Sequence, residues 1–321
     1  MSPARLAGGR PTLPALAGAV AIAFSAILYR YADVSPSTGA LFRCAYAVPP
    51  LLLLAWWEDR RLGPRPWRTR AWAWLAGAFF AFDLLLWHHS IEYVGAGLAT
   101  VLGNTQVVLV GVLAWFLYRE RPSAPLLAAI PVAMGGIVLI SGVLDEGAYG
   151  DDPLQGVVYG VLTGVAYTGF LLTLRHGSSD LRRVAGPLYD ATLASAVLII
   201  PAGLALGDLD FLPPPSAQGW LILLALSSQV VGWLLITVSL PRLPAVVTSV
   251  LLTLQPVCSV VFAAVLLGED PSPLQLVGVA AILSGLLLAS AARRGGDVAP
   301  PDGPGRGTAQ QRERDQELVP Q

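Results

Sequence analysis

The sequence has 321 residues, of which 55% are hydrophobic and only 13% charged, and its mean hydropathy is +0.63. These values lie outside the range of ordinary soluble domains and indicate an integral membrane protein. The formal net charge is −1 and the sequence has no basic stripe with interleaved aromatic residues, so we expect no nucleic acid partner. Cys44 and Cys258 both lie in apolar segments, where neither a disulfide framework nor a metal site is expected.

A bilayer core of about 30 Å requires roughly 20 apolar residues in each membrane-spanning helix. Ten segments meet this requirement, so we predict an all-α membrane protein with ten transmembrane helices. In chain order the predicted helices span residues 13–32, 38–57, 71–92, 95–118, 124–144, 153–174, 185–206, 217–240, 244–267 and 272–292. Residues 293–321 are rich in Pro, Gly, Gln and charges, which predicts a disordered tail.

All twenty basic residues are arginine, and most of them lie in alternate connections between the predicted helices. By the positive-inside rule the arginine-rich side faces the cytoplasm, which places residues 1–12 and 293–321 there as well. The densest basic group follows the second helix and comprises Arg60, Arg61, Arg65, Arg68 and Arg70. Around this connection lie Trp56, Trp57, Trp67, Trp72 and Trp74, a pattern typical of anchors at the membrane interface.

One stretch of the sequence occurs twice, because residues 84–139 and 233–288 align without a gap at a constant offset of 149 positions. The alignment matches polar residues as well as apolar ones: Gln106 with Gln255, Glu120 with Glu269, and Gly136 with Gly285. The chain therefore divides into two five-helix repeats, residues 13–144 and 153–292. Five is an odd number, so we predict that the second repeat enters the membrane from the opposite side, which is typical of alternating-access transporters.

Two features of this pattern resemble a known family. Phe42-Arg43 lies at the start of the second helix, and an acidic residue closes helices four and nine, in Arg119-Glu120-Arg121-Pro122 and Gly268-Glu269-Asp270-Pro271. With ten helices in two inverted halves, the chain resembles the EamA family of the drug/metabolite transporter superfamily. The resemblance implies a secondary transporter of the bacterial inner membrane, many of which export amino acids or other small metabolites, and not an enzyme.

Charged residues inside the predicted helices are the first candidates for a site, because a charge within the bilayer costs several kcal/mol. Arg43 has a planar donor fork that suits a substrate carboxylate, although it could equally be a structural arginine that reaches the interface. Asp83 is the deepest acid, and with His88 it forms the predicted proton-coupling pair. The alternatives are that Asp83 bonds a neighbouring helix, and that His89 rather than His88 faces the cavity.

Polar and aromatic side chains near the middle of the bilayer complete the predicted cavity. Amide side chains there could bind substrate, but they also commonly join packed helices. The predicted substrate-binding residues are Arg43, Trp87, His88, Asn104, Gln106, Tyr167, Gln229, Trp233 and Gln255. Asp190 occupies the position in the second repeat that Arg43 occupies in the first, and we expect these two residues to form gates on opposite sides.

Together these features predict a proton-coupled secondary transporter that exports small organic solutes such as amino acids. Its expected partners are the substrate, the bilayer and protons, with a homodimer left open, and no cofactor or metal is expected. The alternatives are a flippase for a lipid-linked substrate and a passive channel. An intramembrane aspartyl protease is disfavoured, because Asp83 lies in Phe80-Ala81-Phe82-Asp83 and not in a Gly-x-Gly-Asp context.

Overall fold

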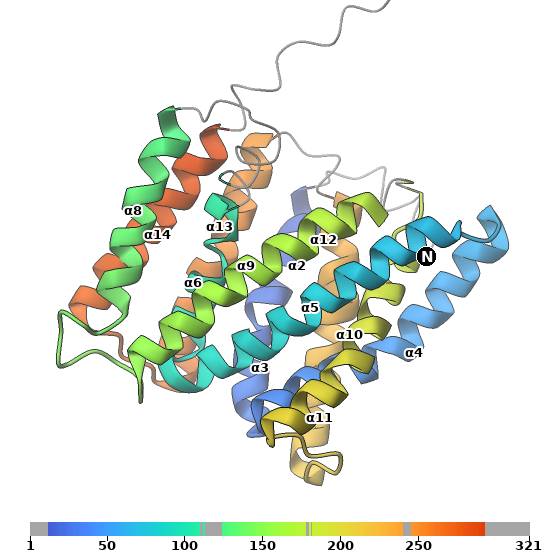
Figure 1. Ribbon diagram of the computed structural model, residues 1–321, viewed down its shortest axis with the longest axis horizontal. Coiled ribbons are helices and arrows are strands. Elements are labelled where there is room, and N and C mark those ends of the chain that lie inside the picture. The colour runs from blue at the N-terminus through green and yellow to red at the C-terminus, as the bar shows by residue number, and fades with distance from the viewer. Residues whose placement is uncertain are drawn as a thin grey trace, which may run out of the picture.

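The computed structural model describes residues 12–109, 112, 124–177, 180, 182–239 and 245–292, which form helices and no strands (Figure 1). The first half contains α2 (Thr12–Ala23), α3 (Ser25–Ala32), α4 (Pro36–Leu62), α5 (Trp67–Val94), α6 (Ala96–Gly103) and α8 (Ala124–Ile140). The second half contains α9 (Pro153–Gly177), α10 (Ala185–Leu206), α11 (Pro215–Leu224), η1 (Ala225–Gly232), α12 (Trp233–Ser239), α13 (Ala245–Phe262), η3 (Ala263–Leu267) and α14 (Pro273–Ala292). Glu120 and the predicted tail lie outside the described residues.

The described helices have the length and composition of membrane helices. Six of them are long and apolar enough to cross a bilayer, and four further apolar helices are shorter. Each of the ten predicted segments overlaps one of these helices, and α4 and α5 extend past their predicted ends. Residues 110, 111 and 113–118 of the fourth predicted segment lie outside the described part of the chain. The chain is therefore a multi-pass membrane protein, whose backbone polar groups are paired within its helices as the bilayer requires.

Three of the membrane helices are interrupted along their length, in addition to the helix that begins with α13 and ends in the π-helical stretch η3. The first is divided into α2 and α3 at Phe24, although the backbone bonds from Phe24 N to Val20 O and from Leu28 N to Phe24 O carry it across the break. The helix from Pro215 to Ser239 contains η1, a stretch of π-helix. The third interruption follows α6, which ends at Gly103. Such irregularities inside membrane helices frequently mark functional sites.

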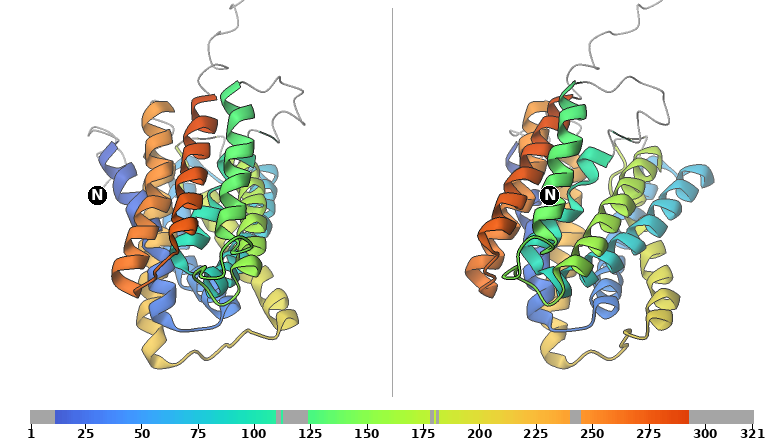
Figure 2. Two further views of the ribbon diagram at one scale, coloured as in Figure 1. Left: turned by 90° about the vertical axis from the view of Figure 1, so that its left-hand side faces the viewer. Right: turned by 60° about the vertical axis from the view of Figure 1, so that its left-hand side comes forward.

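The helices pack in an arrangement that mixes the two halves (Figures 1 and 2). α5 lies along α9, α4 packs against α10, and α2 and α3 pack against α11, η1 and α12. α8 and α14 form a separate pair at one side of the molecule, seen face on in the left view of Figure 2. Contacts between the halves therefore surround the centre of the protein on several sides.

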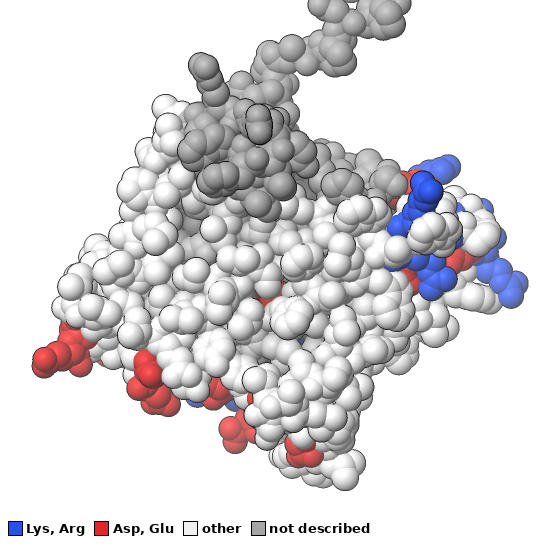
Figure 3. Space-filling view, viewed as in Figure 1, with Lys and Arg blue, Asp and Glu red and all other residues white. Residues whose placement is uncertain are grey.

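Charged side chains separate to opposite ends of this bundle. Figure 3 shows the basic side chains gathered at one edge and a row of acidic side chains along the opposite edge. The basic group lies over the connection between α4 and α5. The surface between the two edges is almost entirely uncharged in this view, as expected for the part of the protein that faces lipid.

Candidate functional site

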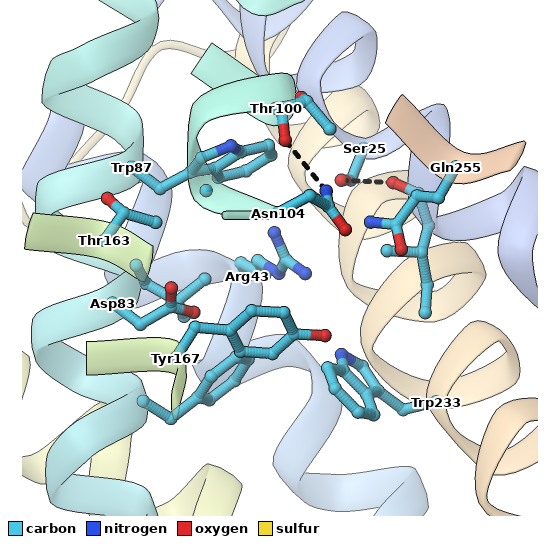
Figure 4. A pocket seen from close by; sticks show the side chains of 14 residues that line it. Ser25, Arg43, Asp83, Trp87, Thr100, Asn104, Thr163, Tyr167, Trp233 and Gln255 are labelled. Atoms are coloured by element: carbon cyan, nitrogen blue, oxygen red, sulfur yellow. Dashed lines mark hydrogen bonds between the residues drawn. The ribbon is translucent and has the colours of Figure 1, made fainter. Parts of the chain in front are cut away.

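A small cavity lies at the centre of the bundle, where side chains from both halves converge (Figure 4). Its volume is about 50 Å³. The lining residues are Ile22, Ser25, Arg43, Phe80, Asp83, Leu84, Trp87, Thr100, Gly103 and Asn104 from the first half, and Thr163, Tyr167, Trp233 and Gln255 from the second. The cavity is thus an interface between the two predicted repeats.

Arg43 projects from α4 into this cavity and is only 3% exposed. Its Nε donates to the Gln229 side chain over 3.3 Å and its second terminal nitrogen donates to the Ser228 hydroxyl over 3.2 Å. Gln229 in turn donates to the Thr192 hydroxyl of α10 over 3.1 Å. Ser228 and Gln229 both belong to η1, so the π-helical stretch supplies the two neutral groups that hold the guanidinium.

The partners of Arg43 are neutral, and no carboxylate among the described residues lies within ion-pair distance of it. The guanidinium carbon also lies 5.5 Å from the centre of the Trp87 ring, a cation–π contact. A buried cation held only by neutral groups and a ring retains unused capacity to bind an anion. Arg43 is therefore equipped to receive an anionic group in the cavity.

Asp83 lines the same cavity from α5 and is 6% exposed. It forms no ion pair with any described residue, and none of the hydrogen bonds among them ends on its carboxyl group. Figure 4 shows Asp83 and Arg43 in the same space, with Tyr167 beside them. The cavity thus contains both an acidic and a basic group that are not joined to each other.

Aromatic rings close the sides of the cavity. Trp233 meets the rings of Phe80, Tyr167 and Phe170 edge-on, with centroid distances of 6.1, 6.2 and 5.3 Å. The indole Nε1 of Trp233 and the hydroxyl of Thr163 are buried without a hydrogen-bond partner in the described part of the chain. Because buried polar groups are normally paired, unpaired groups at a cavity wall favour a polar occupant, either water or a solute.

The interruption after α6 lies directly at the cavity. Asn104 follows the last residue of α6, and its side-chain amide donates to the Thr100 carbonyl over 2.8 Å. Thr105 likewise donates to the Leu102 carbonyl over 2.6 Å. Irregular backbone at membrane depth is tolerated where it lines a cavity, so this break fits a binding site. Gln106 is buried two residues further on and does not line the cavity.

Neither of the two adjacent histidines of α5 lines the cavity. His88 is fully buried with its ring against Tyr29 and Trp87, at centroid distances of 4.4 and 5.0 Å. His89 stacks on Tyr159, and its Nε2 lies 3.5 Å from the carboxylate of Asp208. Asp83 therefore lines the cavity without either histidine.

Asp190 lies outside the cavity and is completely buried. Its carboxylate accepts from Arg65 over 2.6 Å and from Arg70 over 3.3 Å, so it joins α10 to the start of α5 and the preceding connection. Glu58 stabilises the same region by accepting the backbone N–H groups of residues 184–186 at the start of α10. The predicted gate residue is thus part of a charged cluster at one end of the bundle.

Several lining residues are hydroxyl side chains that sequence reasoning did not single out. They are Ser25, Thr100 and Thr163. Helical spacing could have found two of them, because Thr100 precedes Asn104 by four residues and Thr163 precedes Tyr167 by four, which places each pair on one helix face. Ser228 was missed because the π-helical stretch that directs it toward Arg43 has no clear signal in the sequence.

Comparison with known proteins supports the architecture described above. The family model described as "EamA-like transporter family" matches residues 11–142 and 154–291. The "Uncharacterized transporter YwfM" of Bacillus subtilis (strain 168) is 24% identical over 251 residues, covering 76% of this chain and 80% of that protein. The "Uncharacterized transporter YxxF" of the same organism is 26% identical over 223 residues, covering 68% and 69%.

The fold also occurs in a solved structure titled "Crystal structure of protein". The TM-score is 0.60 at 17% sequence identity, and the match covers 89% of this chain and 99% of that one. The two separate family matches cover the two predicted repeats, and the helices in both have the composition of membrane helices. The chain is therefore a membrane transporter and belongs to the EamA-like transporter family.

Proposed function

We propose that this protein is a secondary transporter that exports a small organic solute by alternating access, and that the central cavity is its substrate site. The observation that carries the proposal is Arg43, a buried cation that faces the cavity and whose partners among the described residues are all neutral. A charge inside a membrane protein is costly and is usually retained for function. The planar guanidinium fork suits a carboxylate, which makes a carboxylate-bearing solute the best fit.

Asp83 supplies the proposed link to protons. An amino acid whose carboxylate binds Arg43 could place its ammonium group against the carboxylate of Asp83, since both residues line one cavity. A proton and the ammonium group would then compete for Asp83. Competition for one site favours exchange of a proton for a solute across the membrane, which under an inward proton gradient drives export.

Alternating access in this proposal rests on an inverted relation between the two repeats, residues 13–144 and 153–292, each with five transmembrane helices. The contacts of α8 with α14 support it: Gly136 meets the carbonyl of Gly278, and Gly285 meets the carbonyl of Ala129. At the repeat offset of 149 positions, Gly136 corresponds to Gly285 and Ala129 to Gly278. The aligned residues thus exchange roles across the contact, as a twofold axis between the repeats would require.

The orientation proposed from the arginines places both termini in the cytoplasm of a bacterial cell, with the protein in the inner (plasma) membrane. The relatives named above are bacterial, and the charged groups separate to the two ends of the bundle (Figure 3).

A cavity of about 50 Å³ has room for one or two waters and not for an amino acid. The cycle therefore requires that the halves move apart around Arg43 and Asp83 to admit the solute.

The test begins with a metabolite screen of cells that overproduce the protein, followed by transport in proteoliposomes with and without an imposed pH gradient. We expect gradient-driven accumulation by the wild type. Arg43→Gln should abolish binding, whereas Asp83→Asn should retain solute exchange but lose dependence on the gradient. Asp180→Asn, on an exposed surface away from the cavity, is the control. Gradient dependence that persists in Asp83→Asn would exclude Asp83 as the coupling residue, and passive flux alone would indicate a channel.

A further inference from the structure

The basic group between α4 and α5 divides into paired and unpaired arginines. Arg65 contacts both Asp59 and Asp190, and Arg70 also contacts Asp190. The remaining carboxylate of α4, Glu58, is occupied by the backbone at the start of α10. Arg60, Arg61 and Arg68 form no ion pair with any described residue. The local acids are thus already bound, and three cations are left over.

Each of these three arginines lies against a tryptophan ring. The guanidinium carbon is 3.5 Å from the ring centre in the pair Arg61–Trp57, 4.4 Å in the pair Arg60–Trp56 and 5.7 Å in the pair Arg68–Trp67. Stacking on a ring uses the face of a guanidinium and leaves the N–H groups at its edge free to donate. The three pairs therefore present donors that no described residue occupies, at the edge of the molecule where Figure 3 shows the basic side chains.

The exposed residues of α4 change character in order toward this edge. Leu53 is 68% exposed, Trp56 is 53% exposed, and the exposed Arg60 follows one helical turn later. At a rise of 1.5 Å per residue, Arg60 lies about 6 Å beyond Trp56. α5 shows the same order in reverse, from Arg68 through Trp74 to Leu75, the last two being 40% and 43% exposed. Along both helices, leucine, tryptophan and arginine thus follow in the order that matches the acyl chains, the interface and the headgroups of a bilayer.

From these observations we propose that the three Trp–Arg pairs form a binding site for an anionic phospholipid. The headgroup phosphate accepts from Arg60, Arg61 and Arg68, and the acyl chains lie along the exposed leucines of α4. A lipid fits better than an acidic protein or nucleic acid, because apolar residues and tryptophans at interface depth continue directly into the basic group. The proposal is independent of the transported solute, since none of these residues lines the central cavity.

Native mass spectrometry of the purified full-length protein tests this proposal, with equimolar phosphatidylglycerol and phosphatidylcholine as competing ligands. We expect the wild type to retain phosphatidylglycerol preferentially. The triple variant Arg60→Gln/Arg61→Gln/Arg68→Gln should lose that preference, by about fivefold for each arginine neutralised. Arg182→Gln is the matched control, because Arg182 is exposed but its guanidinium is already bound to Asp180 over 2.9 and 3.0 Å.

Three outcomes would overturn the proposal: equal retention of both lipids by the wild type, an unchanged preference in the triple variant, or an equal loss in Arg182→Gln. A second arm adds glycerol 3-phosphate, which has the charged headgroup without acyl chains. If that soluble anion displaces phosphatidylglycerol at equal concentration, the site binds small anions and not lipids. The unfolding midpoint of each variant in detergent is recorded alongside, and a triple variant with a wild-type midpoint and unchanged lipid preference refutes the site.

Discussion

Glu269 makes the contact whose strength can be tested most directly. It lies in the turn before α14, is only 5% exposed, and accepts the backbone N–H of Ala96 over 2.6 Å and that of Gly97 over 3.1 Å. These N–H groups begin α6, the helix that leads to the cavity residues Thr100 and Asn104. One carboxylate from the second repeat therefore caps a helix of the first.

Replacing Glu269 by alanine removes both acceptors and leaves two buried N–H groups without a partner. Each unpaired buried donor costs about 1–3 kcal/mol. Part of this loss is offset because the variant no longer buries a charge, so we expect a net destabilisation of about 2 kcal/mol. For 321 residues, an unfolding entropy of about 2.1 cal/mol/K per residue converts this energy into a fall of about 3 °C in the unfolding midpoint.

The pH dependence of stability shows which of two opposing effects on the pKa of Glu269 is larger. Burial raises the pKa of its carboxyl group, while the N–H groups of Ala96 and Gly97 and the charge of Arg30 lower it less strongly. A raised pKa means that the native protein binds a proton at a pH where the unfolded chain does not. The wild type should therefore gain stability relative to Glu269→Ala as the pH falls from neutral through the raised pKa, and the gap should stay constant below the pKa of the unfolded chain.

The measurement is the unfolding midpoint of wild type and Glu269→Ala in detergent between pH 7.5 and about 4, with Asp270→Ala as the control. Asp270 is the exposed neighbour of Glu269, and its replacement should change stability by less than about 0.5 kcal/mol. A gap between wild type and Glu269→Ala that narrows on acidification would refute the reasoning. It would show that the two N–H bonds outweigh burial and that the carboxylate is the favoured form.

Three further changes test the packing, the charged cluster and the cavity. A Cβ atom on Gly136 would lie 2.7 Å from the carbonyl oxygen of Gly278, whereas one on Gly135 would meet no atom within 4 Å. Gly136→Ala should thus lower the unfolding midpoint. Gly135→Ala should leave the midpoint unchanged or raise it, because alanine stabilises a helix by up to about 1 kcal/mol relative to glycine. Equal effects of the two substitutions would contradict the close α8–α14 contact. Asp190→Ala leaves buried Arg65 with only its longer contact to Asp59, at 3.5 Å, and should cost up to about 3–5 kcal/mol, against about 0–1 kcal/mol for the half-exposed Arg70→Ala, both measured by thermal unfolding. Trp233→Phe removes an indole N–H that has no partner among the described residues, so stability should hold while KM for the solute rises. An unchanged KM would mean that this N–H does not reach the solute.

Chemistry that depends on residue type and depth could be predicted from the sequence. Arg43 and Asp83 were identified because a charge in an apolar helix is costly, and both line the cavity. What could not be predicted was the rotation of α5 about its axis, which directs Asp83 and Trp87 inward and turns His88 toward Tyr29. Trp87 and His88 are neighbours in sequence, and their side chains project from the helix about 100° apart. That difference in direction makes Trp87 a cavity residue and His88 a packing residue.

Long-range pairing was likewise beyond the sequence. The partners of Asp190 lie more than a hundred residues earlier in the chain, at Arg65 and Arg70, and nothing in the local pattern links them. Gln229 was considered either as a substrate ligand or as a link between packed helices. It does not line the cavity, but it accepts a hydrogen bond from Arg43, which does, and so it helps to position Arg43. The composition of a segment predicts well that it forms a membrane helix. It predicts poorly which face of the helix turns inward, because lipid and neighbouring helices are both apolar.

The alignment of the two repeats suggests why both charged groups among the described lining residues, Arg43 and Asp83, come from the first repeat. Asp83 aligns with Gly232 at the repeat offset, and a Cβ atom on Gly232 would lie 2.8 Å from the side chain of Ile22. An aspartate at this position would crowd Ile22, so the side chain of Ile22 would have to shift before the second repeat could hold an equivalent acid. Among the described lining residues Asp83 is the single carboxyl group, and in our proposal one proton is exchanged for each solute. A scaffold built from two similar halves can alternate between two similar states, and in our proposal the single acid between them couples this alternation to protons.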